Sequence, residues 1–336
     1  YLSLFTWLVD FRIKMKRILI VADKGPDVGL GHIVRSNVLA DKLNEYGQCE
    51  ATILCVNGPP EHYSFAGGNI QSDLIVFDLE KGCPSTRDIE MGRSWNHFKS
   101  LKTCAMIGAG YKSLGYEKLD LSFVQGLPNP APSGPNCYHG LEYIVLRKEF
   151  EQEPVRPYRE PVTAFVCGGG ADPLNFTIKA INALLCVLSV ERILVLLGEF
   201  YKAKRQGEHI GHRYKLNTKN LLVYSDYPNP HELMLLADFA VVSYGMTALE
   251  CLAAGLPTFS CGMTPDHDAS GYTLSKACPA FWHLGPIQTT TTDYIAIAVN
   301  KLYGIEDWIP FRTAARNAVD GKGAERVAAK IMEVLP

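Results

Sequence analysis

The sequence predicts an α/β protein built from two doubly wound, Rossmann-like domains, and three observations support this. Short apolar runs that end at Gly, Asp or Asn alternate with helix-length segments, as expected for buried parallel strands joined by helices. The alternation stops at the Pro- and charge-rich stretch 151–161 and then starts again. The chain has 336 residues, of which 47% are apolar, and this is enough for two separate cores.

The predicted elements follow from these runs in chain order. Strands are expected in the first half at 18–22, 51–56, 74–77, 103–107 and 143–146, and in the second half at 163–167, 193–197, 221–224, 239–243 and 257–261. Helices are expected at 33–46, 174–190, 246–254, 292–303 and, with a break at 320–323, over 314–335. We therefore expect an N-terminal extension at 1–14 and domains at 15–152 and 153–336. Ligands of such sheets bind at the carboxyl ends of the strands, so the active site is expected in a cleft between the domains.

Composition narrows the possible partners. The net charge is −2, from 33 basic and 35 acidic residues without a long run of either sign, so no nucleic acid is expected as a partner. The ten cysteines are scattered without a C-x-x-C pair, which favours a reducing, cytoplasmic location and argues against a metal site. The apolar start, residues 1–11, is too short to span a bilayer, so no membrane insertion is expected. No cofactor is predicted, and the oligomeric state stays open.

A loop punctuated by glycines leads from the first predicted strand into a helix. Gly29 and Gly31 let the backbone approach a bound group, and the amides at the start of the helix favour an anion. His32 stands at that helix start, where it can act as a general base, and the alternative is a capping histidine. The glycines, Asp23 and Arg35 beside it favour catalysis. We predict that His32 is catalytic and that Asp23, Gly29, Gly31 and Arg35 bind substrate.

The second half begins with a similar strand, glycine turn and helix. Gly168, Gly169 and Gly170 suggest a second backbone contact with ligand, with Asp172 close behind them. The alternative is a flexible turn in which Asp172 caps the following helix, and the sequence favours neither interpretation.

A third turn precedes the helix predicted at 246–254. The helix start at Gly245, Met246 and Thr247 can receive a diphosphate, and Glu250 could accept hydrogen bonds from ribose hydroxyls. Taken alone, a glutamate at this place is more often a solvated helix residue. We predict that these four residues bind substrate.

These segments together resemble a known family. The pattern D-x-G-x-x-x-G-x-G-H-x-x-R begins at Asp23, and it is followed by the stretch 140–150, the glycine loop 168–173 and the helix 247–257. The combination is similar to the UDP-sugar hydrolases of pseudaminic acid biosynthesis and the related spore-coat polysaccharide proteins, which share the GT-B fold of MurG-like glycosyltransferases. The resemblance implies that His32 is catalytic and that Glu250 belongs to the nucleotide site. It also implies a nucleotide-sugar, specifically a UDP-sugar, as the partner.

The implied reaction is hydrolysis in nonulosonic acid or surface polysaccharide biosynthesis. Water activated by His32 would attack the anomeric carbon while UDP leaves from the opposite face, which inverts the configuration. Two departures from the family leave the sugar and the reaction open: the sequence has Met-Ile-Gly-Ala-Gly at 106–110 in place of an acidic pair, and Thr-Pro-Asp-His-Asp at 264–268 in place of Asn-Gln. The alternatives are a glycosyltransferase that uses the same base, or a catalytically silent nucleotide-sugar binding protein.

Overall fold

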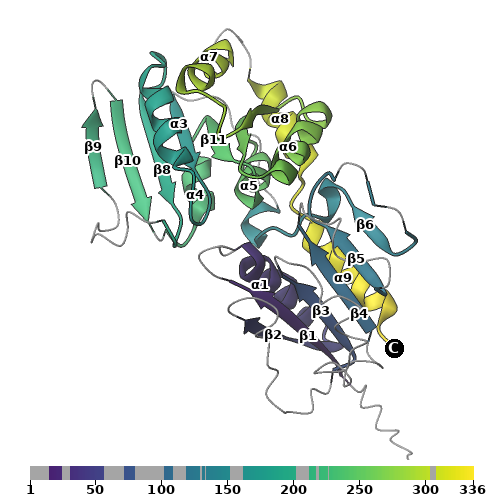
Figure 1. The fold of residues 1–336 in the computed structure, drawn as a ribbon. Coiled ribbons are helices and arrows are strands. Elements are labelled where there is room, and N and C mark those ends of the chain that lie inside the picture. Colours follow the sequence, from purple (N-terminus) through teal and green to yellow (C-terminus); the bar gives the residue numbers. More distant parts are fainter. Residues whose placement is uncertain are drawn as a thin grey trace, which may run out of the picture.

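The computed structural model describes twelve ranges of the chain: 15–24, 31–56, 72–79, 102–108, 119–128, 131–132, 134–151, 162–201, 212–216, 219–225, 227–302 and 308–336. Its strands form two sheets, each accompanied by helices (Figure 1). The predicted extension 1–14 and Gly29 lie outside the described residues.

The first sheet has six parallel strands in the order β2-β1-β3-β4-β5-β6. Its strands are β1 (Lys16–Asp23), β2 (Cys49–Val56), β3 (Leu74–Asp78), β4 (Lys102–Ile107), β5 (Leu121–Val124) and β6 (Cys137–His139). Every residue of β3 is buried, as expected for a central strand whose two faces are both covered. Helix α1 (Gly31–Asn44) follows β1 and packs on β1 and β2.

The second sheet has seven strands in the order β13-β12-β11-β7-β8-β10-β9, all parallel to their neighbours except β9, which is antiparallel to β10. Its strands are β7 (Thr163–Cys167), β8 (Arg192–Leu197), β9 (His212–Leu216), β10 (Lys219–Ser225), β11 (Phe239–Ser243), β12 (Thr258–Gly262) and β13 (Phe281–Pro286). Its helices are α3 (Phe176–Leu185), α4 (Pro230–Leu235), α5 (Met246–Ala253), α6 (Pro265–Ala277), α7 (Thr292–Leu302) and α8 (Ile309–Ala318). Two apolar clusters cover its two faces.

The last helix, α9 (Gly323–Val334), returns to the first sheet, where Figure 1 shows it in yellow. It contacts α1, and its buried residues Ala324, Val327, Ala328 and Ile331 join the core of the first sheet. A Cβ on Gly323 would lie 2.0 Å from the carbonyl oxygen of Ile144, so only glycine permits this approach. The prediction assigned 153–336 to the second domain, whereas the packing places this helix with the first.

The strand predicted at 143–146 is wrong. The segment begins with a 3-10 turn at Leu141–Tyr143 and then runs between the two cores without pairing to a strand. Ile144 and Leu146 enter the core of the second sheet, while Val145 enters that of the first. The run is apolar because it is buried from both sides, and apolarity alone cannot show whether a run has a strand neighbour.

Other differences are smaller. The helix predicted at 174–190 starts at Phe176, because Asp172 and Asn175 before it adopt left-handed backbone conformations, and it ends at Leu185. The prediction missed β5, β6, β9, β13, α4 and α6. None of the helices found in the described ranges combines the length and apolarity that a membrane crossing requires.

Candidate functional site

The two sheets approach each other at the carboxyl ends of their strands. A Cβ placed on Gly31, the first residue of α1, would lie 3.8 Å from Cγ of Met246, the first residue of α5. A Cβ on Gly126, just after β5, would lie 3.7 Å from the hydroxyl of Tyr244, just after β11. We call Gly31, Gly126, Tyr244 and Met246 the junction. The starts of α1 and α5, which were both predicted to face ligand, therefore meet at the junction.

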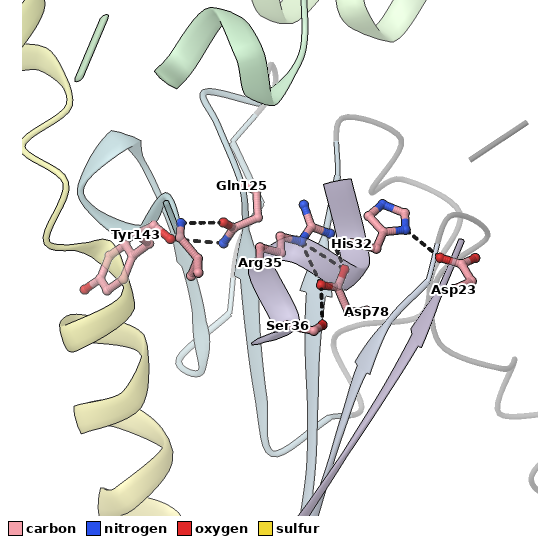
Figure 2. Close-up of polar contacts among 8 residues, drawn as sticks. Asp23, His32, Arg35, Ser36, Asp78, Gln125 and Tyr143 are labelled. Carbon is pink, nitrogen blue, oxygen red and sulfur yellow. Dashed lines mark hydrogen bonds and ion pairs between the residues drawn. The ribbon is translucent and has the colours of Figure 1, made fainter. Parts of the chain in front are cut away.

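His32 lies in the first turn of α1 and is bonded to Asp23, the last residue of β1 (Figure 2). The Nδ1 of His32 is 2.5 Å from Oδ1 of Asp23, and both side chains are buried. When a carboxylate accepts the proton on Nδ1, the lone pair of the neutral ring is on Nε2, and the ring orientation is fixed. This arrangement suits a general base. Asp23, which was predicted to bind substrate, contacts the catalytic candidate, and its contact with substrate stays a prediction.

Arg35 lies one turn further along α1 and pairs with Asp78 at the end of β3 (Figure 2). Its Nε is 2.8 Å from Oδ2 of Asp78, its Nη2 donates to Oδ1, and the hydroxyl of Ser36 donates to Oδ2 at 2.9 Å. The Asp78 side chain is fully buried. The pair fixes α1, and hence His32, against β3. The sequence analysis missed Asp78, although an acid directly after a buried strand was a visible signal.

Gln125 fastens the segment between the sheets to the end of β5. Its amide nitrogen donates to the carbonyl of Tyr143 at 3.0 Å, and its amide oxygen accepts the N–H of Val145 at 2.9 Å (Figure 2). These bonds satisfy backbone groups that lack a strand partner. Gln125 was also missed, because nothing in its sequence surroundings marks this role.

The glycine loop of the second sheet is shaped by Asp172. Its two carboxylate oxygens accept the N–H groups of Phe176 and Thr177, at 2.7 and 2.8 Å, at the start of α3. A Cβ on Gly168 would lie 2.4 Å from Cγ of Asp172. The carboxylate therefore has the geometry of the capping alternative.

The other two glycines of this loop pack closely against neighbouring strand ends. Gly169 has φ +88°, and its Cβ would lie 3.3 Å from the hydroxyl of Ser243 at the end of β11. The carbonyl oxygen of Gly170 would lie 2.2 Å from a Cβ on Gly198. The loop thus lies at the carboxyl edge of the sheet, and its contact with substrate stays a prediction.

The start of α5 faces open space. A Cβ on Gly245 would meet nothing within 4 Å among the described residues. The amides of the first turn, at Met246 and Thr247, have no earlier helical carbonyls to bond and can bind an anion. Burial raises the pKa of the Cys167 thiol to about 11, so this thiol is neutral and a poor nucleophile.

Glu250 is buried on α5 rather than solvated. Burial raises the pKa of its carboxyl, Arg147 acts in the opposite direction and Glu149 adds to the rise. The Nη1 of Arg147 is 3.9 Å from Oε1 of Glu250. Arg147 lies in the stretch 140–150 that contributes to the family resemblance, but no role was predicted for it.

The segments that depart from the resembled family occupy two strand ends. Residues 264–268 begin α6, where the hydroxyl of Thr264 caps the helix by accepting the N–H of His267 at 3.2 Å. The rings of His267 and Tyr244 lie 5.8 Å apart, and burial lowers the pKa of His267, so this ring is neutral at neutral pH. Met106 and Ile107 are buried in β4, whereas residues 109 and 110 lie outside the described part.

Comparison with known proteins gives distant sequence relatives. No family model matches the chain. An uncharacterized protein of Methanocaldococcus jannaschii is 24% identical over 279 residues, which are 72% of this chain and 54% of that protein. The chain thus spans about half the length of this relative. The spore coat polysaccharide biosynthesis protein SpsG of Bacillus subtilis is 22% identical over 94% of this chain and 97% of its own length.

Solved structures resemble the whole chain. MurG of Acinetobacter baumannii has a TM-score of 0.60 at 14% identity and covers 95% of this chain and 100% of its own. The spinosyn rhamnosyltransferase SpnG, in complex with thymidine diphosphate, reaches 0.62 at 12% identity and covers 95% and 100%. MnaA of S. aureus, solved with UDP, reaches 0.58 at 10% identity and covers 96% and 97%. The chain has the GT-B fold.

The GT-B assignment confirms the predicted fold class of two doubly wound domains. The match to SpsG supports the spore-coat part of the resemblance at the level of a distant relative. The closer likeness to pseudaminic acid hydrolases and the individual site residues stay predictions. In this GT-B chain, the described residues include no group of three or more His, Cys, Asp or Glu side chains that could hold a metal ion.

Proposed function

We propose that the protein is a nucleotide-sugar hydrolase that releases UDP from a UDP-activated acetamido-deoxy sugar. The observation that carries this proposal is the buried pair of Asp23, at the end of β1, and His32, in the first turn of α1. His32 follows Gly31, which faces Met246 at the start of α5. The pair supplies a base, and the open start of α5 supplies donors for a diphosphate. Neighbours of the same fold are named for UDP and thymidine diphosphate complexes, which supports this ligand class.

The proposed chemistry needs one proton transfer. As the oxygen of a water molecule attacks the anomeric carbon, His32 takes a proton from that water, and the bond from this carbon to the UDP oxygen breaks. Attack from the face opposite to the leaving group inverts the configuration. Diphosphate is a good leaving group, and the amides of α5 stabilise the charge that develops on it. The proposed reaction therefore needs no carboxylic acid to protonate the leaving group, unlike that of ordinary glycosidases. Asp23 stabilises the His32 imidazolium that forms.

A glycosyltransferase is the second candidate, and the GT-B neighbours named as glycosyltransferases favour it. In that reaction the same pair would deprotonate a hydroxyl of an acceptor. The two candidate reactions differ only in the nucleophile and therefore share the site. They can be distinguished by testing whether nucleotide release requires an acceptor.

The test incubates the protein with a panel of UDP-, TDP- and CDP-sugars, without and with acceptors, and follows nucleotide and sugar products by NMR. We expect release without an acceptor and an inverted anomer as the first sugar product. Release only with an acceptor would establish the transferase instead. Binding of nucleotide-sugar without any turnover would leave a silent binding protein and overturn both catalytic candidates.

Substitutions at the pair sharpen this test. His32→Ala should lower the rate of nucleotide release by about 10²- to 10⁴-fold, the usual contribution of a general base, with nucleotide affinity unchanged. Asp23→Asn should lower the rate too, and the double variant should be no slower than His32→Ala alone, because the two side chains act as a unit. His139→Ala, on the edge strand β6, is the matched control and should retain activity. A fully active His32→Ala variant would contradict the proposed mechanism.

A further inference from the structure

Arg147 lies where the segment between the sheets reaches α5. Leu146 before it enters the core of the second sheet, and Gln125 holds the start of the segment to the first. The backbone around Arg147 is therefore fixed from both sides. Its guanidinium points toward the buried carboxylate of Glu250, with Nη1 at 3.9 Å from Oε1.

The Nη1 atom of Arg147 is buried and, within the described part of the chain, has no hydrogen-bond partner. A buried donor without a partner is costly, and a charged one more so. The separation of 3.9 Å from Glu250 is too long for a hydrogen bond but short enough for a strong attraction between opposite charges. The structure thus keeps a positive charge close to Glu250 without consuming the acceptor capacity of its carboxylate.

The other groups around Glu250 do not replace Arg147. The neighbouring thiols are Cys167 on β7 and Cys251 on α5, and burial raises the pKa of both, so neither carries charge at neutral pH. Glu149, two residues after Arg147, is exposed and acts against ionisation of Glu250. Of the charged groups named here, only Arg147 favours the carboxylate.

We propose that Arg147 is a positioning residue for the nucleotide: it holds Glu250 ionised and aimed so that the carboxylate accepts hydrogen bonds from both vicinal hydroxyls of a ribose. The inference rests on the proposed function, which places a nucleoside diphosphate at α5. An ionised carboxylate offers two acceptor oxygens, whereas the protonated acid gives one of them up to a donor. Recognition of ribose over 2′-deoxyribose therefore depends on the charge that Arg147 maintains.

The experiment compares the affinities for UDP and 2′-deoxy-UDP from acidic to mildly alkaline pH by calorimetry. The diphosphates of the two probes titrate alike, so the ratio of their dissociation constants isolates the hydroxyl contact. We expect the wild type to prefer UDP by about tenfold at neutral pH, the order of one hydrogen bond to a charged group. The preference should vanish at acidic pH, where Glu250 becomes protonated.

Variants of the three consecutive residues 147–149 should change the pH at which the preference for UDP is lost in different ways. Arg147→Gln should move the loss of preference to higher pH, because the pKa of Glu250 then rises further. Glu149→Gln should move it to lower pH, since the carboxylate loses a like charge nearby. Lys148→Gln removes a positive charge from an exposed neighbour and should leave the profile unchanged. Arg147→Lys keeps the charge and should keep a profile close to that of the wild type.

Each outcome bears on a separate claim. Identical profiles for wild type and Arg147→Gln would overturn the inference while the proposed function stands. If Arg147→Gln does not fold, Arg147→Lys still decides: a profile close to that of the wild type supports the inference, and a loss of preference at clearly higher pH, despite the retained charge, would overturn it. A wild type that binds neither probe at any pH would overturn the proposed function, and the inference with it.

Discussion

Glu250 shows how one buried carboxylate lowers stability at the proposed nucleotide site. Burial raises the pKa of this group, so the folded state favours its protonated form. A raised pKa of an acid contributes stability that is fully present below the pKa of the unfolded chain and is lost as pH rises through the folded pKa. At neutral pH the ionised group therefore reduces the free energy of unfolding. Sites that bind ligands commonly retain such a penalty.

Glu250→Gln should raise the free energy of unfolding at neutral pH, since the amide resembles the protonated acid that burial favours. At acidic pH the two proteins should be equally stable. Thermal unfolding across pH measures this difference, and Glu333→Gln, on the exposed end of α9, serves as the control. A stability difference that does not change with pH would contradict the expected titration of Glu250.

At the scale of elements, two helix starts at the carboxyl edges of the sheets are used differently. The start of α3 is closed by Asp172, whose carboxylate occupies two of its amides, whereas the start of α5 follows Gly245 and is left open. Both helices follow a strand and a glycine turn. The similar sequences of the two turns therefore do not show which helix start has amides available to a ligand. Among the residues that the structure describes, the first turn of α5 keeps amides without a partner, which fits the proposed contact with a diphosphate.

Asp172→Ala should cost about 0.5–2 kcal/mol of stability, the usual value of a helix cap, without changing UDP affinity. Asp172→Asn keeps an acceptor oxygen and should recover part of the loss. Thermal unfolding and calorimetry on the same samples separate the two effects. Weaker UDP binding with unchanged stability would favour the alternative interpretation, in which Asp172 contacts substrate.

Strands were predictable mainly where both faces are buried, and helices where the apolar pattern is long. The runs that became β3, β7 and β11 are buried at every position, and each was predicted. Two of the missed strands have sequences that are atypical of a buried strand: β9 contains His212, Arg213 and Lys215, and β13 contains Gly285 and Pro286. Short strands give too little pattern to detect: β5 is buried at every position but has four residues, and β6 has three.

Candidate site residues could be predicted from local sequence patterns, but contacts between residues far apart in the sequence could not. The loop that bears His32 carries its own glycine pattern. The partner of Arg35 is 43 residues away, and only the neighbouring positions of β1 and β3 in the sheet show that Asp78 is the acid it meets. The same holds for Arg147 and Glu250, which belong to a connecting segment and a helix of the second sheet. Pairings of this kind depend on strand order, which one sequence does not reveal.

At the scale of the whole molecule, the chain passes between the two sheets twice. The first passage is the segment that contains Arg147, and the second precedes α9. Arg316 on α8 ties the first passage to α5, because its Nη1 donates to the carbonyls of Phe150 and Ala253 at 2.6 and 2.8 Å. Because α9 packs on the first sheet, its contacts contribute to the stability of that sheet.

Ile331→Ala, which removes a fully buried side chain of α9, should cost about 2–5 kcal/mol. Native-state hydrogen exchange should show faster exchange in β1 and β3 than in β7 and β11. Ile295→Ala on α7 is a matched control, since that side chain is equally buried but packs on the second sheet, and it should give the opposite pattern. Equal loosening of both sheets by Ile331→Ala would contradict the assignment of α9.

The return of α9 makes the second domain an insertion within the first. A chimera that exchanges the second domain with that of another GT-B protein therefore needs two crossover points, one in the segment after β6 and one between α8 and α9. A single crossover would pair the last helix of one parent with the first sheet of the other. The close contact of Gly323 with the Ile144 backbone would then join residues that were never selected together.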